Sequence, residues 1–159
     1  MATRNGNGAE HDRPMPNEHV NAAQDAAATP LFLLATLIVD DDEGVRFFLR
    51  NYLESLGVTH ILEATNGQEA VEVVKRRTDL GLVITDLKMP KMDGVEMVQQ
   101  IHALNPTLPV VVLTAYPDYP RIVETAKRGA LFVMKPIELQ ALDQIVGGIL
   151  KHPPMSFHM

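Results

Sequence analysis

The chain has 159 residues, 46% of them apolar, and this size fits one domain with a single buried core. The net charge is -6 at pH 7, and both residues 1–30 and the rest of the chain are net acidic, which argues against nucleic acid as a direct partner. Cysteine is absent, so disulfides and thiolate zinc sites are excluded. The longest apolar run, residues 31–39, is far shorter than the ~20 residues of a membrane-spanning helix, so we expect no membrane span and a cytoplasmic location.

Residues 1–30 differ in composition from the rest of the chain. They are polar and rich in alanine and asparagine, with three prolines and almost no large apolar side chains. Such a segment cannot bury enough surface to offset the entropy lost on ordering. We therefore predict a flexible N-terminal extension over 1–30, a folded domain over 31–151 and a short C-terminal tail over 152–159.

The folded part begins with two strand and helix pairs. An apolar run predicts a strand at 33–39, and apolar residues at helical spacing predict a helix at 43–56 that ends at Gly57. A second strand is predicted at 60–64. Asn66 and Glu69 then have the spacing of a capping box, which predicts a helix that continues to residue 76.

The same alternation continues to residue 150. Strands are predicted at 80–85, 110–113 and 131–134, and helices at 94–104, 121–128 and 138–150. Several of these strands are apolar on both faces, as in a parallel sheet that is covered by helices on both sides. The sequence thus predicts an α/β fold with a doubly wound, five-stranded parallel sheet.

Polar residues follow four of the five predicted strands, and in a sheet of this kind ligands bind beyond the carboxyl ends of the strands. These residues are Asp40, Asp41 and Asp42 after the first strand, Asp86 after the third, Thr114 after the fourth and Lys135 after the fifth. Clustered carboxylates repel one another unless a cation neutralises them, and oxygen ligands alone favour magnesium over zinc. Magnesium, a lysine and a hydroxyl around a carboxylate suit phosphoryl transfer to that carboxylate.

Each of these residues also has an ordinary structural explanation. An acidic residue after a strand commonly caps the next helix, and we expect Asp42 or Glu43 to do so at the helix that begins near residue 43. Asp40 or Asp86 alone would be a weak motif, and Lys135 before a proline would be a solvated lysine. The combination at four strand ends favours a functional site.

Four segments resemble the receiver domains of two-component response regulators. They are VDDDEGVR (39–46), TDLKMPKMDG (85–94), VVVLTAY (110–116) and FVMKP (132–136). Their order and spacing match the family across residues 34–150. The resemblance implies a flavodoxin-like fold of the receiver type, and with only 151–159 beyond the last predicted helix we expect a stand-alone, single-domain receiver.

The resemblance also assigns a phosphorylation and metal site. It implies that Asp86 is the phosphorylated aspartate and that Asp40 and Asp41 form the acidic pocket. Asp41 would be the more direct Mg²⁺ ligand, and the backbone carbonyl of Lys88 would complete the ligands that the protein supplies.

The remaining carried-over residues form the switch. Lys135 would contact the phosphoryl group, the Thr114 hydroxyl would move toward it after transfer, and the Phe132 ring would turn inward with Thr114. The chain is one residue shorter than usual between Gly129 and Lys135, so we expect an altered turn before the fifth strand.

The resemblance further implies partners. The phosphoryl group would come from a phosphohistidine of a sensor histidine kinase or a histidine phosphotransfer protein. The chain would promote its own Mg²⁺-dependent phosphorylation and dephosphorylation without being a conventional enzyme. Output would be a protein contact through the fourth helix, fifth strand and fifth helix. The sequence leaves open whether the chain is a shuttle, a regulator or a phosphate sink, and whether it forms a homodimer.

Two other functions are weighed against this one. A phosphatase of the haloacid dehalogenase type would use Asp40 as nucleophile in an Asp-x-Asp pair with Asp42. That pattern lacks the usual Thr or Val where Gly44 stands, leaves Asp86 unexplained and allows no cap domain. A non-phosphorylated interaction module would leave the combination of acids, Thr114 and Lys135 unexplained.

Overall fold

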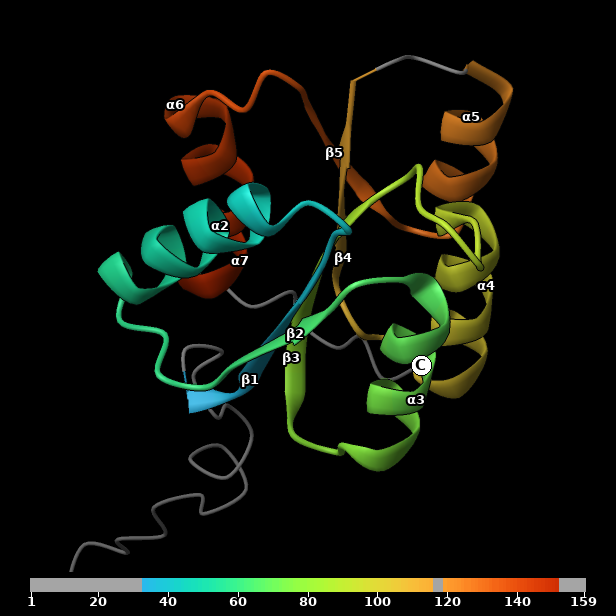
Figure 1. Ribbon diagram of the computed structural model, residues 1–159, viewed down its shortest axis with the longest axis horizontal. Helices are drawn as coiled ribbons and strands as arrows, with labels where there is room; N and C mark the ends of the chain where they lie inside the picture. Colours follow the sequence, from blue (N-terminus) through green and yellow to red (C-terminus); the bar gives the residue numbers. More distant parts are fainter. Residues whose placement is uncertain (1–32, 116–118, 152–159) are drawn as a thin grey trace, which may run out of the picture.

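Five strands form one parallel sheet in the computed structural model, which describes residues 33–115 and 119–151 (Figure 1). The strands are β1 (Ala35–Val39), β2 (Ile61–Ala64), β3 (Leu80–Asp86), β4 (Val110–Thr114) and β5 (Leu131–Met134). Their order across the sheet is β2-β1-β3-β4-β5. The order reverses between β1 and β3, so the carboxyl ends of these two strands form the crevice where doubly wound sheets bind ligands.

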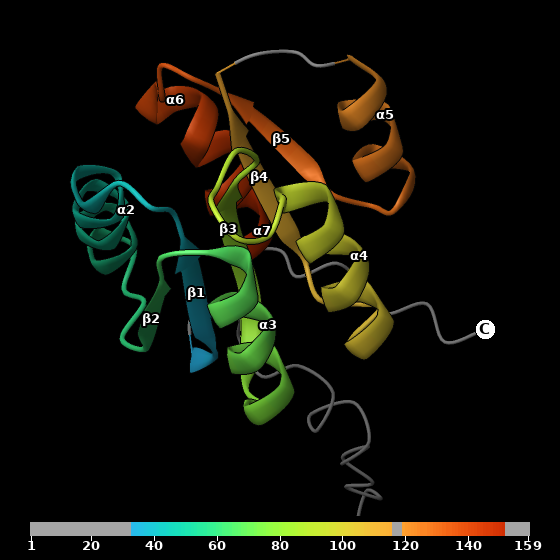
Figure 2. The same cartoon turned by 45° about the vertical axis from the view of Figure 1, so that its right-hand side comes forward.

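Helices cover both faces of this sheet (Figures 1 and 2). They are α2 (Glu43–Ser55), α3 (Gly67–Arg76), α4 (Gly94–Leu104), α5 (Tyr119–Lys127) and a C-terminal helix made of α6 (Leu139–Leu142), η2 (Asp143–Gly147) and α7 (Gly148–Lys151). One apolar cluster joins α2 and the C-terminal helix to one face, and a second joins α3 and α4 to the other. The predicted α/β fold, with its five strands, is confirmed.

The helix starts follow the predicted chemistry closely. Asp42 caps α2, because its Oδ1 accepts the N–H of Gly44 at 2.7 Å. Asn66 caps α3 by accepting the N–H of Glu69 at 2.9 Å. The Glu69 carboxylate accepts the N–H of Thr65 at 2.9 Å, so the returning bond of the capping box goes one residue earlier than expected.

Several element boundaries differ from the prediction by one or two residues, and the largest differences are at the starts of β1 and α5. β1 begins at Ala35 instead of residue 33, and α5 begins at Tyr119 instead of residue 121. The residues proposed for the flexible extension (1–30) and the C-terminal tail (152–159) lie outside the described residues. Of the helices in the described ranges, none combines the length and apolar content that crossing a membrane requires.

The C-terminal helix was predicted to be regular but contains a π-helical turn, η2. Asp143 Oδ1 accepts the hydroxyl of Tyr52 from α2 at 3.1 Å. A Cβ on Gly147 would lie 2.7 Å from that same oxygen, so a larger residue at this position would require the Asp143 carboxylate to move. The π-helical turn therefore begins at the residue through which the C-terminal helix contacts α2.

Candidate phosphorylation site

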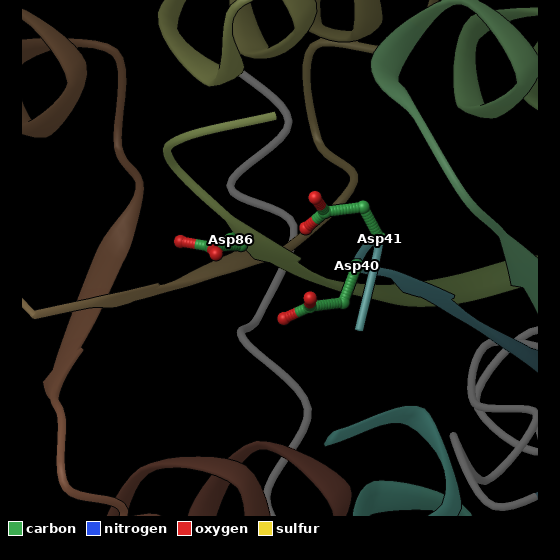
Figure 3. A group of neighbouring side chains, drawn as sticks. All are labelled: Asp40, Asp41 and Asp86. Carbon is green, nitrogen blue, oxygen red and sulfur yellow. The ribbon is translucent and has the colours of Figure 1, made fainter. Parts of the chain in front are cut away.

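Three carboxylates meet at the carboxyl ends of β1 and β3 (Figure 3). Asp40 and Asp41 directly follow β1, and Asp86 is the last residue of β3. Val39 pairs with Thr85 in the sheet, so the next residue on each strand reaches the same edge. Each of the three offers a carboxylate oxygen, and these oxygens lie within 4.8 Å of one another. The register of two neighbouring strands therefore builds the acidic cluster that the sequence predicts.

Asp40 is the buried member of the cluster, with 1% of its surface exposed. Its Oδ1 accepts the N–H of Asp42 at 2.9 Å, while its buried Oδ2 has no hydrogen-bond partner. Lys135 Nζ lies 3.6 Å from Oδ2, close enough for an ion pair but too far for a hydrogen bond. Burial raises the pKa of Asp40. The Asp42 N–H and the Lys135 charge oppose that shift, whereas the charges of Asp86 and Asp41 add to it.

Both carboxylate oxygens of Asp86 accept hydrogen bonds. Its Oδ1 accepts the N–H of Leu87 at 2.6 Å, and its Oδ2 accepts a hydrogen bond from Lys135 Nζ at 3.1 Å. The main chain of Lys135 is itself anchored, because its N–H donates to the carbonyl of Thr114 at 2.7 Å. Asp86, Thr114 and Lys135 line one cavity of about 110 Å³. The structure thus brings together the acid, the hydroxyl residue and the lysine that the sequence singled out.

The loop between β3 and α4 (Gly94–Leu104) depends on a glycine. The N–H of Gly94 donates to the carbonyl of Leu87 at 3.0 Å. A Cβ at position 94 would lie 2.8 Å from both the Cα and the carbonyl oxygen of Leu87, closer than real side chains approach. The loop therefore closes tightly behind the residue whose N–H holds Asp86.

The comparisons with known proteins agree with this geometry. A family model described as the response regulator receiver domain matches residues 36–147. The chain belongs to this family. Among solved structures, the receiver fold of this chain is similar to a CheY-like response regulator receiver domain protein from Methanospirillum hungatei JF-1. The TM-score is 0.69 and the identity 27%, over 75% of this chain and 94% of that one.

Two curated relatives differ in how much of their length the receiver covers. The chain is 34% identical over 122 residues to Sporulation initiation phosphotransferase F of Bacillus subtilis (strain 168), which covers 76% of this chain and 94% of the relative. It is 36% identical over 121 residues to Transcriptional regulatory protein ZraR of Klebsiella oxytoca, of which it spans only 27%. The receiver thus spans about a quarter of the transcriptional regulators that it matches.

Lys88 and Phe132, two residues with predicted roles, lie outside the group formed by Asp86, Lys135 and the other two acids. Lys88 is exposed, and its N–H points to Asp86 Oδ1 at a long 3.4 Å. Phe132 is half-buried on β5 and packs against the apolar cluster that contains α3 and α4. The Lys88 carbonyl as a metal ligand and Phe132 as the switch aromatic stay predictions.

Two arginines at the site were not predicted. Arg46 donates from Nη1 to the carbonyl of Asp40 at 2.8 Å, and its Nε lies 3.4 Å from Glu63 Oε2 on β2, so it fixes the loop that carries the acids. Arg121 lines the cavity beside Asp86 and forms an ion pair with Asp93. Both contacts join separate elements, and no local sequence pattern signals them.

The geometry does not favour the phosphatase alternative. Asp42 uses its carboxylate to cap α2 and does not form a shared site with Asp40. Asp40, the nucleophile of that mechanism, is 1% exposed, whereas Asp86 faces the cavity. Of Asp40 and Asp86, the carboxylate that is open to the cavity is therefore Asp86.

Proposed function

We propose that this receiver accepts a phosphoryl group on Asp86 from a phosphohistidine of a sensor histidine kinase or a histidine phosphotransfer protein. The observation that carries the proposal is the position of Lys135 Nζ, 3.1 Å from Asp86 Oδ2, beside a cavity of about 110 Å³. A carboxylate that is open on one side and paired with a fixed ammonium group is a suitable phosphoryl acceptor.

Transfer exchanges one bond at phosphorus for another. A carboxylate oxygen of Asp86 bonds to phosphorus as the bond from phosphorus to the histidine nitrogen breaks, and the electron pair of that bond stays on the nitrogen. The Lys135 ammonium would stabilise the charge on the phosphoryl oxygens, and the Thr114 hydroxyl would donate to one of them. Attack of water on the aspartyl phosphate later returns Asp86 to a carboxylate.

The acidic cluster fits a magnesium ion. All three side chains offer oxygen, the ligand atom that Mg²⁺ prefers. The buried Asp40 Oδ2 has no hydrogen-bond partner, and a bound cation would satisfy it. Asp40, Asp41, Asp86 and the carbonyl of Lys88 would hold the ion. When bound, Mg²⁺ supplies positive charge that reduces the repulsion between Asp86 and the incoming phosphoryl oxygens.

Exposed apolar side chains on β5 and α6 support the proposed output contact. Leu131 and Met134 of β5 and Leu139 of α6 are large apolar side chains that face solvent. They lie within the surface formed by α5, β5 and the C-terminal helix, which we propose binds the output protein or a second copy of the chain. A pull-down that compares phosphorylated protein with Asp86→Asn identifies the partners, because only those sensitive to that change carry the output.

Phosphorylation of purified protein tests the acceptor residue. Incubation with acetyl phosphate and Mg²⁺ should add one phosphoryl group by intact mass, and chelation of Mg²⁺ should prevent it. Asp86→Asn should show no adduct. Asp79→Asn is the matched control, because Asp79 pairs with Arg77 away from the acidic cluster, and it should be phosphorylated like the wild type. An adduct that persists in Asp86→Asn would disprove the assignment.

A further inference from the structure

Arg121 is a second cation at the phosphorylation cavity. It lies in the first turn of α5 (Tyr119–Lys127), is half-buried, and lines the cavity together with Asp86 and Lys135. At about 110 Å³ the cavity is far larger than the space of a single water molecule, so it can hold the three oxygens of a phosphoryl group. A phosphoryl group on Asp86 would enter a space that already has a guanidinium in its wall.

The position of Arg121 within α5 favours an anionic partner. The N-terminal end of a helix carries partial positive charge, so a cation in the first turn is destabilised unless an anion lies close to it. Arg121 forms an ion pair with the Asp93 carboxylate. This contact joins α5 to the loop that follows Asp86.

Asp93 uses its two oxygens for different purposes. Oδ1 accepts the N–H of Val95 at 2.7 Å and caps α4, whereas Oδ2 faces Arg121. The cap holds whether or not Arg121 is present, so the ion pair can be lost without loss of the helix start. A second polar link between α4 and α5, from Gln99 Nε2 to Glu124 Oε1 at 2.8 Å, involves neither Asp93 nor Arg121.

We propose that, when Asp86 is phosphorylated, Arg121 leaves its ion pair with Asp93 and binds the phosphoryl group instead. This inference rests on the proposed function. Asp93 offers Arg121 one charge in a pair that is partly open to solvent, and such pairs are weak. A phosphoryl group carries about -1.5 to -2 charges and presents several oxygens to the planar guanidinium, which makes it the stronger partner.

The exchange couples phosphorylation to α5. In the unphosphorylated state Arg121 ties the first turn of α5 to the loop that carries Asp93. After the exchange the same residue ties α5 to the end of β3. The phosphoryl group thus changes which element holds α5, and α5 belongs to the surface proposed to bind the output protein.

Binding of beryllium fluoride in the presence of Mg²⁺ tests the exchange, because this complex takes the place of a phosphoryl group on a carboxylate. Arg121→Gln should weaken binding about tenfold, by loss of a charge-assisted contact. Asp93→Asn keeps the cap but removes the competing charge, so it should strengthen binding by roughly two- to fivefold. Asp93→Asn should have no effect once Arg121 is Gln, since the two act through one contact.

Lys127→Gln is the charge-matched control. Lys127 is an exposed cation in the last turn of the same helix and does not line the cavity, so its loss should leave binding unchanged. Equal losses in Lys127→Gln and Arg121→Gln would overturn the proposal in favour of general electrostatics. Tighter binding in Asp93→Asn cannot arise from misfolding, so the opposite signs of the two site variants keep the test decisive.

Hydrogen exchange without Mg²⁺ or beryllium fluoride tests the resting ion pair separately. Asp93→Asn and Arg121→Gln should each speed exchange of the hydrogen-bonded amides of α5 to a similar extent, and Lys127→Gln should not. Unchanged exchange in both site variants would overturn the resting contact. If Asp86 is phosphorylated but Arg121→Gln binds beryllium fluoride like the wild type, the exchange is wrong and the proposed function stands. If Asp86 is not phosphorylated at all, the proposed function fails first.

Discussion

The acids and the cations of the site come from two regions of the sheet that are packed very differently. The acidic half consists of β1, β3 and α4, and the basic half consists of β5 and α5. All of β1 and nearly all of β3 are buried, whereas β5 has one buried residue, Val133. α4 buries four large apolar side chains, and in α5 the one fully buried residue among the described side chains is Thr125.

This difference in packing means that the carboxylates are held in place more firmly than the cations. Asp40, Asp41 and Asp86 are held by central strands whose displacement would open the core. Lys135 and Arg121 are held by an edge strand and a half-buried helix, which can shift at a smaller cost in buried surface. The acidic half is thus suited to fixing the carboxylates, and the basic half to changing position when a phosphoryl group appears.

A matched pair of isoleucines, one in each half, tests this difference in packing. Ile101 in α4 is 0% exposed, so Ile101→Ala should lower the free energy of unfolding by about 2–5 kcal/mol, through lost burial and the cavity left behind. Urea unfolding measures the change. A loss below about 1 kcal/mol would contradict the proposed difference between the two halves, because Ile101 would then be packed no better than an ordinary surface residue.

The partner of that variant lies in the basic half. Ile122 in α5 is half-buried, so Ile122→Ala should cost only about 1 kcal/mol in the same urea titration. Both substitutions place alanine in a helix, so differences in helix propensity largely cancel. Equal losses for the two variants would show that α5 is held as firmly as α4.

The buried charge of Asp40 in the acidic half is expected to have a smaller effect on stability. The raised pKa of Asp40 means that the folded state binds this proton more tightly than the unfolded state. Without Mg²⁺, the stability supplied by protonated Asp40 is therefore present at low pH and lost as pH rises through the raised pKa. Asp40→Asn mimics the neutral form and should raise the melting temperature by a few degrees at neutral pH.

Calorimetry at pH 7 in the presence of a chelator measures this shift. Added Mg²⁺ should raise the melting temperature of the wild type and have little effect on Asp40→Asn, because the variant offers the ion less charge. Asp79→Asn is the control, since its pKa is lowered by Arg77 and its replacement should bring no gain. A lower melting temperature for Asp40→Asn without Mg²⁺ would mean that the acidic half tolerates its buried charge.

Local sequence patterns predicted most of the fold because they depend on periodicity and on where strands end. They misplaced the start of β1, since residues 33 and 34 are apolar but pairing with β3 begins only at Ala35. They also missed the π-helical turn, which accompanies a hydrogen bond between Tyr52 and Asp143 on different helices. A strand boundary needs a neighbouring strand, and a wide helical turn needs a contact from elsewhere in the fold.

The site divides in the same way. Asp40, Asp86 and Lys135 were predictable because each stands at the carboxyl end of a parallel strand, a position that a single sequence reveals. Arg46 and Arg121 were not, because each lies in a helix and acts through a partner on another element. Their side chains have no distinctive spacing, so only the assembled fold shows their partners.

The hydrogen bond between Asp86 and Lys135 also bears on the order in which the domain is completed. The two residues are 49 positions apart, and the lysine directly follows the edge strand β5. A nascent chain that has formed β1, β3 and β4 already has its three carboxylates in place but lacks the ammonium that offsets them. Docking of β5 therefore completes the sheet and brings one positive charge to a site with three negative ones, and Mg²⁺ would offset the remaining charge.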